Sequence, residues 1–162
     1  MRTRTRLAIA GLAIVAAAGA ATPAFADADR SDSQQSDPGC ASQFDEAQRV
    51  DMESFRDYDL ATWKAGHDDD AITVLASGVW FQGRDRIAAV LHSHFENREA
   101  TWTWTELTRA VDGCKTGTIL YDATYAIPSA NFHQRAYVSV IYTYKHGKWL
   151  SVLDQSTLVA AT

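Results

Sequence analysis

The apolar residues change their spacing near Arg98, and this change constrains the fold more than any other feature of the chain. Between Ser42 and Asn97 they recur mostly every three to five residues, as on one face of an amphipathic helix. After Arg98 apolar and polar residues alternate, which is typical of strands with one buried face. Helices followed by consecutive strands predict an α+β domain.

Three helices are expected in the first half of the chain. The first covers residues 42–66, and the second is a short helix over residues 67–76. The carboxylates of Asp68–Asp70 are interpreted as the start of this second helix rather than a metal cluster, because they can accept hydrogen bonds from the free N–H groups of a first turn. A short extended piece at residues 79–81 precedes a third helix over residues 84–97.

Four strands are expected in the second half, at residues 99–111, 115–127, 133–145 and 148–159. Asp112-Gly113 and His146-Gly147 are dipeptides that favour tight turns. Strands joined by tight turns must be antiparallel. Each helix has a single apolar stripe, so the helices should cover one face of this sheet.

The N-terminus has the three parts of a secretory signal peptide. Three arginines near the start precede an uncharged apolar run at residues 7–21, and the small-residue site Ala24-Phe25-Ala26 follows. The run is too short for a membrane span, which needs about 20 apolar residues. We therefore expect residues 1–26 to be a signal peptide cleaved after Ala26. The mature protein should be secreted or extracytoplasmic, with no membrane span.

The charge of the chain limits its partners. Loss of residues 1–26 takes the formal net charge from −5 to −8, because three arginines and no acid are removed. Such an acidic chain has no electrostatic footprint for nucleic acid or an anionic membrane. Residues 27–41 are polar without an apolar period and predict a flexible leader. Residues 42–160 then form one domain of ordinary size.

Cys40 and Cys114 are the only cysteines. An even number of cysteines in an oxidising compartment favours a disulfide between them, the alternative being two unrelated buried thiols. No histidine pair has the spacing of a zinc site, and no glycine-rich phosphate loop occurs. We therefore expect no metal and no cofactor.

Three motifs resemble a known family: Trp63–Asp68 (WKAGHD), Gly83–Ile87 (GRDRI) and His146–Leu150 (HGKWL). Together they are similar to motifs of the SnoaL-like branch of the nuclear transport factor 2-like superfamily, over about residues 42–157. The resemblance implies a cystatin-like cone, in which three N-terminal helices pack in a curled four-stranded antiparallel sheet. It also implies a pocket in the mouth of the cone, in a superfamily of enzymes, binders and association modules.

Candidate pocket residues come from the register of the last hairpin. The turn at His146-Gly147 should place Tyr142 opposite Ser151 and Val138 opposite Gln155, all on one face. The resemblance implies that this face is concave. The ligand-binding candidates are Tyr58, Asp59, Trp63, Trp80, Tyr142 and Gln155. Alternatively, these residues are core aromatics and one satisfied amide.

Asp122 is the best candidate for a catalytic residue. It lies in the middle of a strand, where aspartate is depleted. If it is buried, its pKa would be raised and it could serve as a general acid or base. Otherwise it faces solvent or bonds a neighbouring strand. Asp154 poses the same question on the face opposite Gln155.

Three functions remain open at this point. The first is a secreted domain that binds a small apolar or aromatic molecule in an aromatic-lined pocket. The second is an enzyme of the polyketide cyclase or isomerase/hydratase type, which uses a pocket carboxylate as general acid or base. The third is a dimerisation module with a vestigial pocket, a possible homodimer with Trp102 or Trp104 at its outer face. An enzyme needs an acid inside the cone within reach of its ligand, whereas a binder does not.

Overall fold

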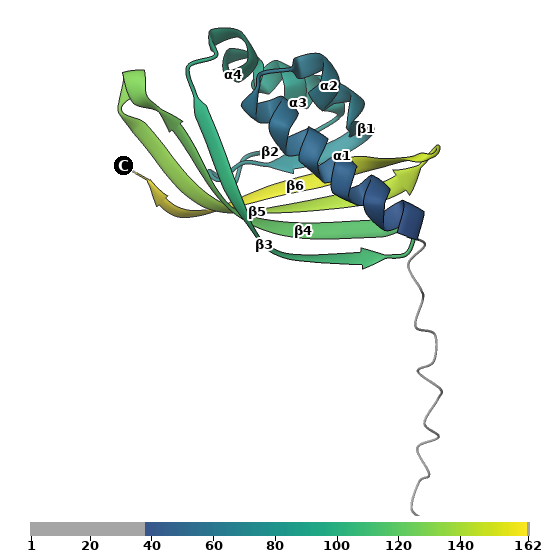
Figure 1. Cartoon of the computed structure of the whole chain (residues 1–162). Coiled ribbons are helices and arrows are strands. Elements are labelled where there is room, and N and C mark those ends of the chain that lie inside the picture. Colours follow the sequence, from purple (N-terminus) through teal and green to yellow (C-terminus); the bar gives the residue numbers. More distant parts are fainter. Residues whose placement is uncertain (1–37, 162) are drawn as a thin grey trace, which may run out of the picture. The chain divides into compact units, whose positions relative to one another are not determined.

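A computed structural model of the chain describes residues 38–161, so the expected signal peptide and most of the expected leader lie outside the described residues. Helices lie over the concave side of a curled, open sheet (Figure 1). The helices are α1 (Pro38–Arg56), α2 (Leu60–Ala65), α3 (Arg84–Val90) and α4 (His92–Asn97), with a single 3-10 turn η1 at Pro128–Ala130. The strands are β1 (His67–Val74), β2 (Trp80–Gln82), β3 (Thr101–Asp112), β4 (Thr116–Ile127), β5 (Phe132–Lys145) and β6 (Lys148–Ala161).

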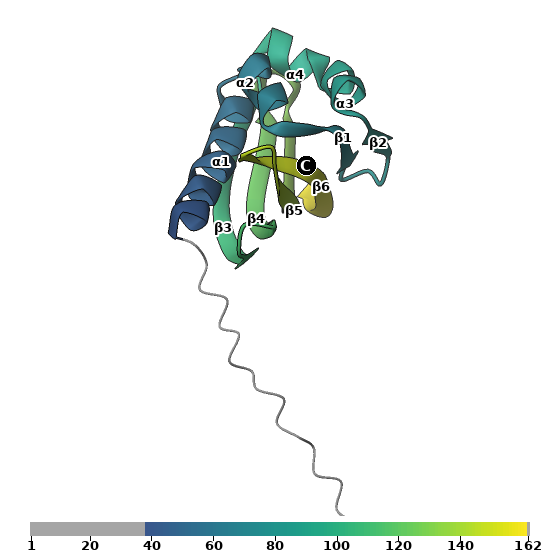
Figure 2. The same cartoon turned by 90° about the vertical axis from the view of Figure 1, so that its right-hand side faces the viewer.

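The sheet has the strand order β2-β1-β6-β5-β4-β3. All neighbouring strands are antiparallel except β1 and β6, which are parallel. The α+β class is confirmed, but the sheet has six strands and is mixed, where four antiparallel strands were expected. Figure 2 shows α1 on the side of β3, whereas α3 lies over β1 and β2 on the other side.

The expected helix at residues 67–76 is wrong, because β1 occupies this segment. Its second half is the β-branched run Ile72–Val74, which packs well in a pleated sheet. Asp68 does not cap a helix but pairs with Lys145 of β5, with the Lys145 Nζ 2.8 Å from its Oδ2. Asp69 pairs with Arg84 of α3 at 2.8 Å, so the acidic run is explained by ion pairs and solvent rather than by a helix start.

Both longer helices are interrupted. The expected first helix is divided into α1 and α2 at Tyr58, whose backbone has a φ of 59° in the left-handed region. Asp59 then caps α2 by accepting a hydrogen bond from the Thr62 N–H at 3.0 Å. The third helix is likewise divided at Leu91, and α1 begins at Pro38, ahead of its expected start.

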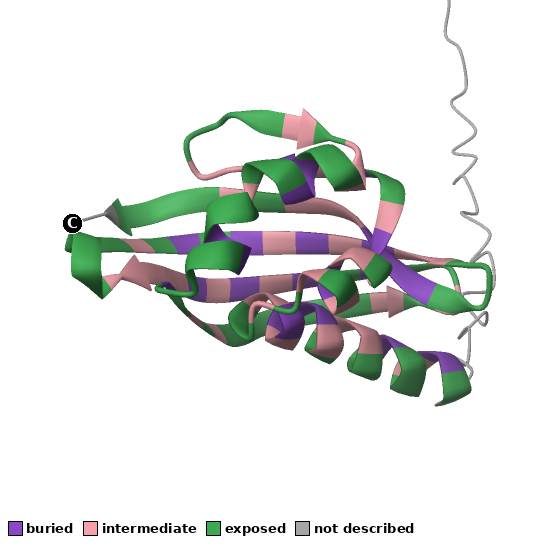
Figure 3. Ribbon diagram, turned by 90° about the horizontal axis from the view of Figure 1, so that it is seen from above, coloured by how far each residue is buried: buried purple, intermediate pink, exposed green. Residues whose placement is uncertain are grey.

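The core is a set of aromatic rings between α1 and the sheet. Phe44 is fully buried and meets the rings of Tyr142 and Trp149 edge-on, with centroids 5.4 and 5.2 Å apart. A Cβ at Gly117 would lie 2.3 Å from the Phe44 ring, so glycine is required where α1 approaches β4. Figure 3 shows buried residues recurring along the central strands beneath the helices.

Strand β6 has an extra residue at two places along β5, Val152 and Val159, and the one at Val152 lies beside the residues of the last hairpin. Tyr142 lies opposite Ser151, as expected, but its neighbour Ile141 lies opposite Leu153. Val152 therefore has no partner of its own on β5, which is the arrangement of a β-bulge. From Leu153 to Leu158, each β6 side chain therefore faces the side opposite to the one that an uninterrupted alternation predicts.

The bulge makes the expected register wrong beyond Ser151. Val138 lies opposite Ser156 rather than Gln155, which pairs with Ser139 instead, and Val140 lies opposite Asp154. Asp154 consequently shares the concave face with buried Val140, whereas Gln155 is exposed on the convex face.

The expected disulfide is present between Cys40 and Cys114, whose Cα atoms are 5.5 Å apart. It joins the first turn of α1 to the turn between β3 and β4, across a sequence separation of 74 residues. The bond holds the start of α1 against the sheet, next to the close contact of Phe44 with Gly117.

Removal of this disulfide should destabilise the domain strongly. We expect Cys40→Ala with Cys114→Ala to lower the free energy of unfolding by about 4 kcal/mol, because a closed loop of this length removes much entropy from the unfolded chain. Urea denaturation measures the change. Reductant should lower the midpoint of the wild type but not that of the double variant. Two free thiols in the denatured, unreduced wild type would contradict the bridge.

Candidate functional site

A cavity of about 330 Å³ lies between the concave face of the sheet and the helices. Its lining residues come from α1, α2, β1 and its following turn, α3, α4 and all four strands β3 to β6. This volume lies within the range of about 300–1,000 Å³ that small-molecule sites occupy.

One wall of the cavity is aromatic. Phe55 of α1 contacts Trp102 of β3, with ring centroids 5.5 Å apart, and Trp102 is 6.4 Å from Tyr125 of β4. Tyr125 in turn is 6.4 Å from Phe132 at the start of β5. These four rings form a continuous surface from a helix across to the sheet. Such a surface suits a flat apolar or aromatic ligand.

His94 of α4 completes the aromatic wall and is held in one tautomer. Its ring stacks on Phe55 at 3.8 Å, and its Nε2 lies 2.8 Å from the Phe55 carbonyl oxygen. Because a carbonyl only accepts, Nε2 carries the hydrogen, and Nδ1 accepts from the Tyr125 hydroxyl at 3.2 Å. Burial lowers the pKa of His94, so the ring is neutral at pH 7.

The other end of the cavity is acidic, and Asp51 of α1 is its buried member. The Tyr142 hydroxyl donates to Asp51 Oδ2 at 2.6 Å, and His67 Nε2 lies 3.8 Å from Asp51 Oδ1. The His67 Nδ1–H donates to the Trp63 carbonyl at 2.7 Å. The pKa of Tyr142 is raised well above its usual value, mainly by burial and further by the charge of Asp51. Tyr142 is therefore a hydrogen-bond donor at neutral pH.

Asp154 of β6 is the second acid of the cavity. Burial, reinforced by the charge of Asp51, raises its pKa to about 7. Among residues 38–161 no group donates a hydrogen bond to its carboxylate, and its partly exposed surface faces the cavity. A carboxyl group that is half ionised near pH 7 can both accept and donate a proton.

Two of the ligand-binding candidates belong to this site. Trp63 is buried and lines the cavity. Tyr142 lies behind the cavity wall and reaches the site through its hydrogen bond to Asp51.

The structure places Tyr58 and Asp59 outside the cavity. Tyr58 donates its hydroxyl hydrogen to the Ala100 carbonyl, and Asp59 uses both carboxylate oxygens on Thr62 to cap α2. Both residues position the break between α1 and α2. They contribute to the site only by shaping the helices around it.

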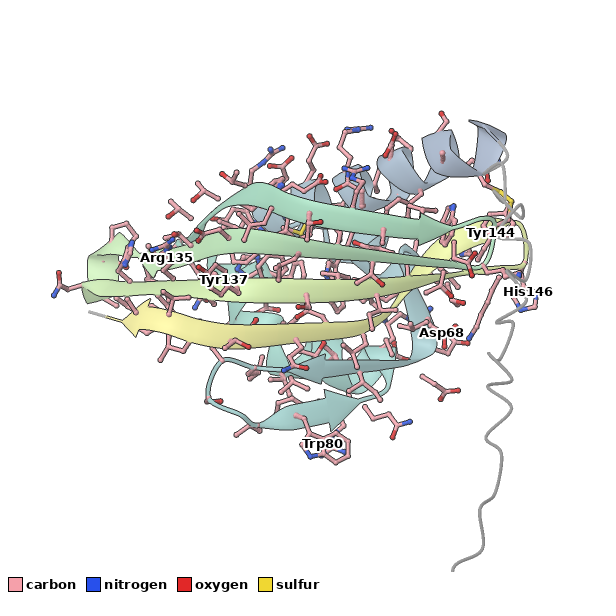
Figure 4. The ribbon with its side chains drawn as sticks, turned by 90° about the horizontal axis from the view of Figure 1, so that it is seen from below. Asp68, Trp80, Arg135, Tyr137, Tyr144 and His146 are labelled. Atoms are coloured by element: carbon pink, nitrogen blue, oxygen red, sulfur yellow. A yellow bond between two sulfur atoms is a disulfide. The ribbon has the colours of Figure 1, made fainter. Side chains whose placement is uncertain are left out.

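Trp80 and Gln155 also lie outside the cavity. Trp80 is 60% exposed on the edge strand β2, where its side chain points away from the sheet (Figure 4). Gln155 is exposed on the convex face because of the bulge at Val152. The tertiary structure therefore places both residues outside the pocket in which they were expected.

Asp122 is not a pocket acid. It pairs with Arg135, with the Arg135 Nε 2.8 Å from Oδ1 and Nη2 2.5 Å from Oδ2. Arg135 lies on the convex face of the sheet (Figure 4). This guanidinium lowers the pKa of Asp122. The carboxylate is thus explained by an ion pair between neighbouring strands, the alternative interpretation of its mid-strand position.

Sequence reasoning did not single out Asp51 or His94. Asp51 lies four residues after Ala47 and four before Phe55, within the apolar stripe of the first helix. An acid inside an apolar stripe was the available signal. His94 precedes Phe95 in the stripe of α4, where no spacing distinguishes it from a solvated histidine.

Comparison with known proteins supports the fold. No protein-family model matches the sequence, and no curated protein sequence matches it significantly. Solved structures do match. A hexachlorocyclohexane dehydrochlorinase aligns with a TM-score of 0.64 at 11% identity, over 76% of this chain and 88% of that chain. The chain has the nuclear transport factor 2-like fold.

Two further structures make the same point. A domain of unknown function with a cystatin-like fold from Nostoc punctiforme has a TM-score of 0.62 at 13% identity, over 74% of this chain and 77% of that chain. An NTF2-like protein of unknown function from Shewanella oneidensis has a TM-score of 0.60 at 11% identity, over 72% and 98%. At these identities the likeness concerns the fold alone. The fold that the three sequence motifs implied is therefore confirmed.

No group of three or more histidine, cysteine, aspartate or glutamate side chains within residues 38–161 is placed to hold a metal ion.

The raised pKa of Asp154 should be visible in the stability of the protein. The folded chain holds this proton up to about pH 7, whereas the unfolded chain releases it near pH 4. Ionisation therefore costs stability as the pH rises through this window. We expect Asp154→Asn to become more stable relative to wild type between pH 4.5 and pH 8, by on the order of 2–4 kcal/mol.

Urea denaturation at the two pH values measures this difference. Asp122→Asn is the matched control, because the pKa of Asp122 is lowered and its loss should give no gain in stability at high pH. The same pH dependence in Asp154→Asn and wild type would show that Asp154 titrates as an ordinary carboxyl group.

Proposed function

We propose that the chain is an extracytoplasmic protein that binds a small apolar or aromatic molecule in the cavity of its cone. The observation that carries this proposal is a cavity of about 330 Å³ with a wall of four contiguous aromatic rings and polar groups at one end. This combination is the usual make-up of a small-molecule site.

The extracytoplasmic location is supported by two independent features. Disulfides such as Cys40–Cys114 form and persist mainly in oxidising compartments. The sequence of residues 1–26 has the layout of a secretory signal peptide. Among the described helices, none combines the length and the apolar character needed to cross a membrane.

Binding in the cavity can be tested with the neutral aromatic dye N-phenyl-1-naphthylamine. We expect the dye to quench tryptophan fluorescence, because Trp63 and Trp102 line the cavity. Ser156→Phe should weaken dye binding at least tenfold, since Ser156 lines the cavity and a phenyl ring there would fill it. Fluorescence titration gives both dissociation constants.

The adjacent residue offers a matched control. Thr157 is exposed and lies opposite Tyr137 on the convex face, so Thr157→Phe should bind the dye as wild type does. Circular dichroism confirms that both variants are folded. Equal binding by the folded Ser156→Phe variant would show that the dye does not occupy the cavity.

General acid–base catalysis is a second candidate function, and Asp154 is the observation that favours it. An acid with a pKa of about 7 lies inside the cone, where an enzyme of this type requires one. Tyr142 and His67 approach the neighbouring Asp51 and hold its carboxylate in place. In this alternative Asp154 is the proton acceptor, in the role first considered for Asp122.

Proton abstraction next to a carbonyl group tests this alternative. We expect the wild type to exchange the acidic C–H protons of 2-tetralone for deuterium in D2O, as followed by NMR. Asp154→Asn should slow this exchange about 100-fold or more, which is the usual contribution of a general base. Asp122→Asn should exchange at the wild-type rate. Equal rates for wild type and Asp154→Asn would exclude Asp154 as the base for this reaction class.

The structure gives no support to a dimer built on Trp102 or Trp104. Trp102 lines the cavity, and the Arg56 guanidinium lies 5.6 Å from the ring centroid of Trp104 on the inner side. Both rings therefore face the helices, and neither is a free aromatic on the outer face of the sheet.

A further inference from the structure

We infer that the cavity selects an organic cation: an ammonium group that pairs with Asp154, attached to an aromatic body that lies along the wall of Phe55, Trp102 and Tyr125. The inference rests on the proposed function, because it names the ligand class of that same cavity. Four observations carry it.

The first observation is the charge of the lining. Asp51 and Asp154 both line the cavity, whereas the described lining contains no lysine and no arginine. His94 is the basic side chain among these residues, and its two ring nitrogens are engaged by the Phe55 carbonyl and the Tyr125 hydroxyl. The described wall of the cavity therefore presents negative charge without a fixed counterion.

The second observation is the difference between the two acids. Asp51 accepts a hydrogen bond from Tyr142 of β5 and faces His67 of β1. The carboxylate of Asp154 has neither a hydrogen bond nor an ion pair within residues 38–161. The charged or titratable groups near it are Asp51, Tyr142 and, beyond Asp51, His67. A carboxylate removed from bulk water is stabilised by a cationic partner, and an ammonium ligand would supply one.

The third observation is the distance along the sheet between Asp154 and the exposed Phe132, which both line the cavity. Asp154 lies opposite Val140, whereas Gln134 and Phe132 line the cavity at the start of the same strand. Six residues separate Val140 from Gln134, which corresponds to about 20 Å at a strand rise of about 3.3 Å per residue. Phe132 is 39% exposed, whereas Asp51 is 6% exposed. An amphiphilic ligand thus enters with its charged group first.

The fourth observation is the negative net charge of the whole chain. Its formal net charge is −5, so the protein's field attracts cations and repels anions. Aromatic rings add to this preference, because their negative faces attract an ammonium group. A carboxylate ligand of the same shape would meet two acids and, in the described lining, no lysine or arginine.

Three probes with one skeleton test the inference: 2-phenylethylamine, 2-phenylethanol and phenylacetate. At pH 8 isothermal titration calorimetry should show the amine binding at least tenfold more tightly than the alcohol, with no binding of phenylacetate. The affinity for the amine should rise about tenfold from pH 6 to pH 8, because Asp154 ionises in this window while the amine stays charged.

Two variants separate charge from shape. Asp154→Asn should bind the amine no more tightly than the alcohol, at either pH, while keeping the wild-type affinity for the alcohol. Asp122→Asn removes an acid on the convex face and should keep the full preference for the amine. Thermal melts and binding of N-phenyl-1-naphthylamine confirm that each variant is folded with its cavity intact.

The outcomes distinguish this inference from the proposed function. Equal binding of amine and alcohol by the wild type, or an unchanged preference in Asp154→Asn, would overturn the cation inference and leave the small-molecule site in place. Dye binding without any binding of the amine would do the same. Failure of the dye and of all three probes to bind would overturn the proposed function itself, and the inference with it.

Discussion

The extra residue at Val152 determines which side chains of β6 the cavity receives. Side chains of a strand alternate between its two faces, so one inserted residue reverses every face that follows. The reversal directs Asp154 and Ser156 into the cone and Gln155 away from it. Without the bulge, the cavity would have an amide and an apolar residue at these positions, and its acidic end would be reduced to Asp51.

The acidic end shows how a fold can accept an unfavourable group. Asp51 is buried, but the Tyr142 hydroxyl satisfies one of its oxygens and His67 stands near the other. Burial raises the pKa of Asp154 to about 7, and its carboxylate has no such partner. The ionised form of Asp154 therefore reduces the stability of the folded chain. Groups that reduce stability in this way are concentrated at functional sites, which agrees with a ligand or substrate that supplies the missing interaction.

The aromatic wall and the acids come from different layers of the structure. Phe55 and Asp51 lie one turn apart on α1, and the neighbouring rings and Asp154 lie on the sheet. The close contact of Phe44 with Gly117 and the Cys40–Cys114 bridge both fix α1 against the strands. These two contacts hold the N-terminal half of α1, the helix that carries Asp51 and Phe55, on the sheet. The shared fold of the matched structures specifies this architecture but no single ligand.

The sequence by itself determined the class of the fold and most of its last four strands. Alternating residues, tight-turn dipeptides and the cysteine pair are local or compositional signals, so they predicted β3 to β6 and the disulfide. It also indicated Trp63 as a residue of the site, through the apolar stripe of its helix.

Only the tertiary structure decided that residues 67–74 form a strand and that Asp154 rather than Asp122 faces the cavity. Strand β1 pairs with the nearby β2, but it joins the main sheet by pairing in parallel with β6, a partner more than seventy residues away, and no local pattern encodes such a pairing. The bulge at Val152 depends in the same way on how β6 fits β5, whereas the pairing of Asp122 with Arg135 depends on the register of β4 with β5. Local patterns specify which segments form helices and strands, but the pairing of distant segments decides which of their side chains face the cavity.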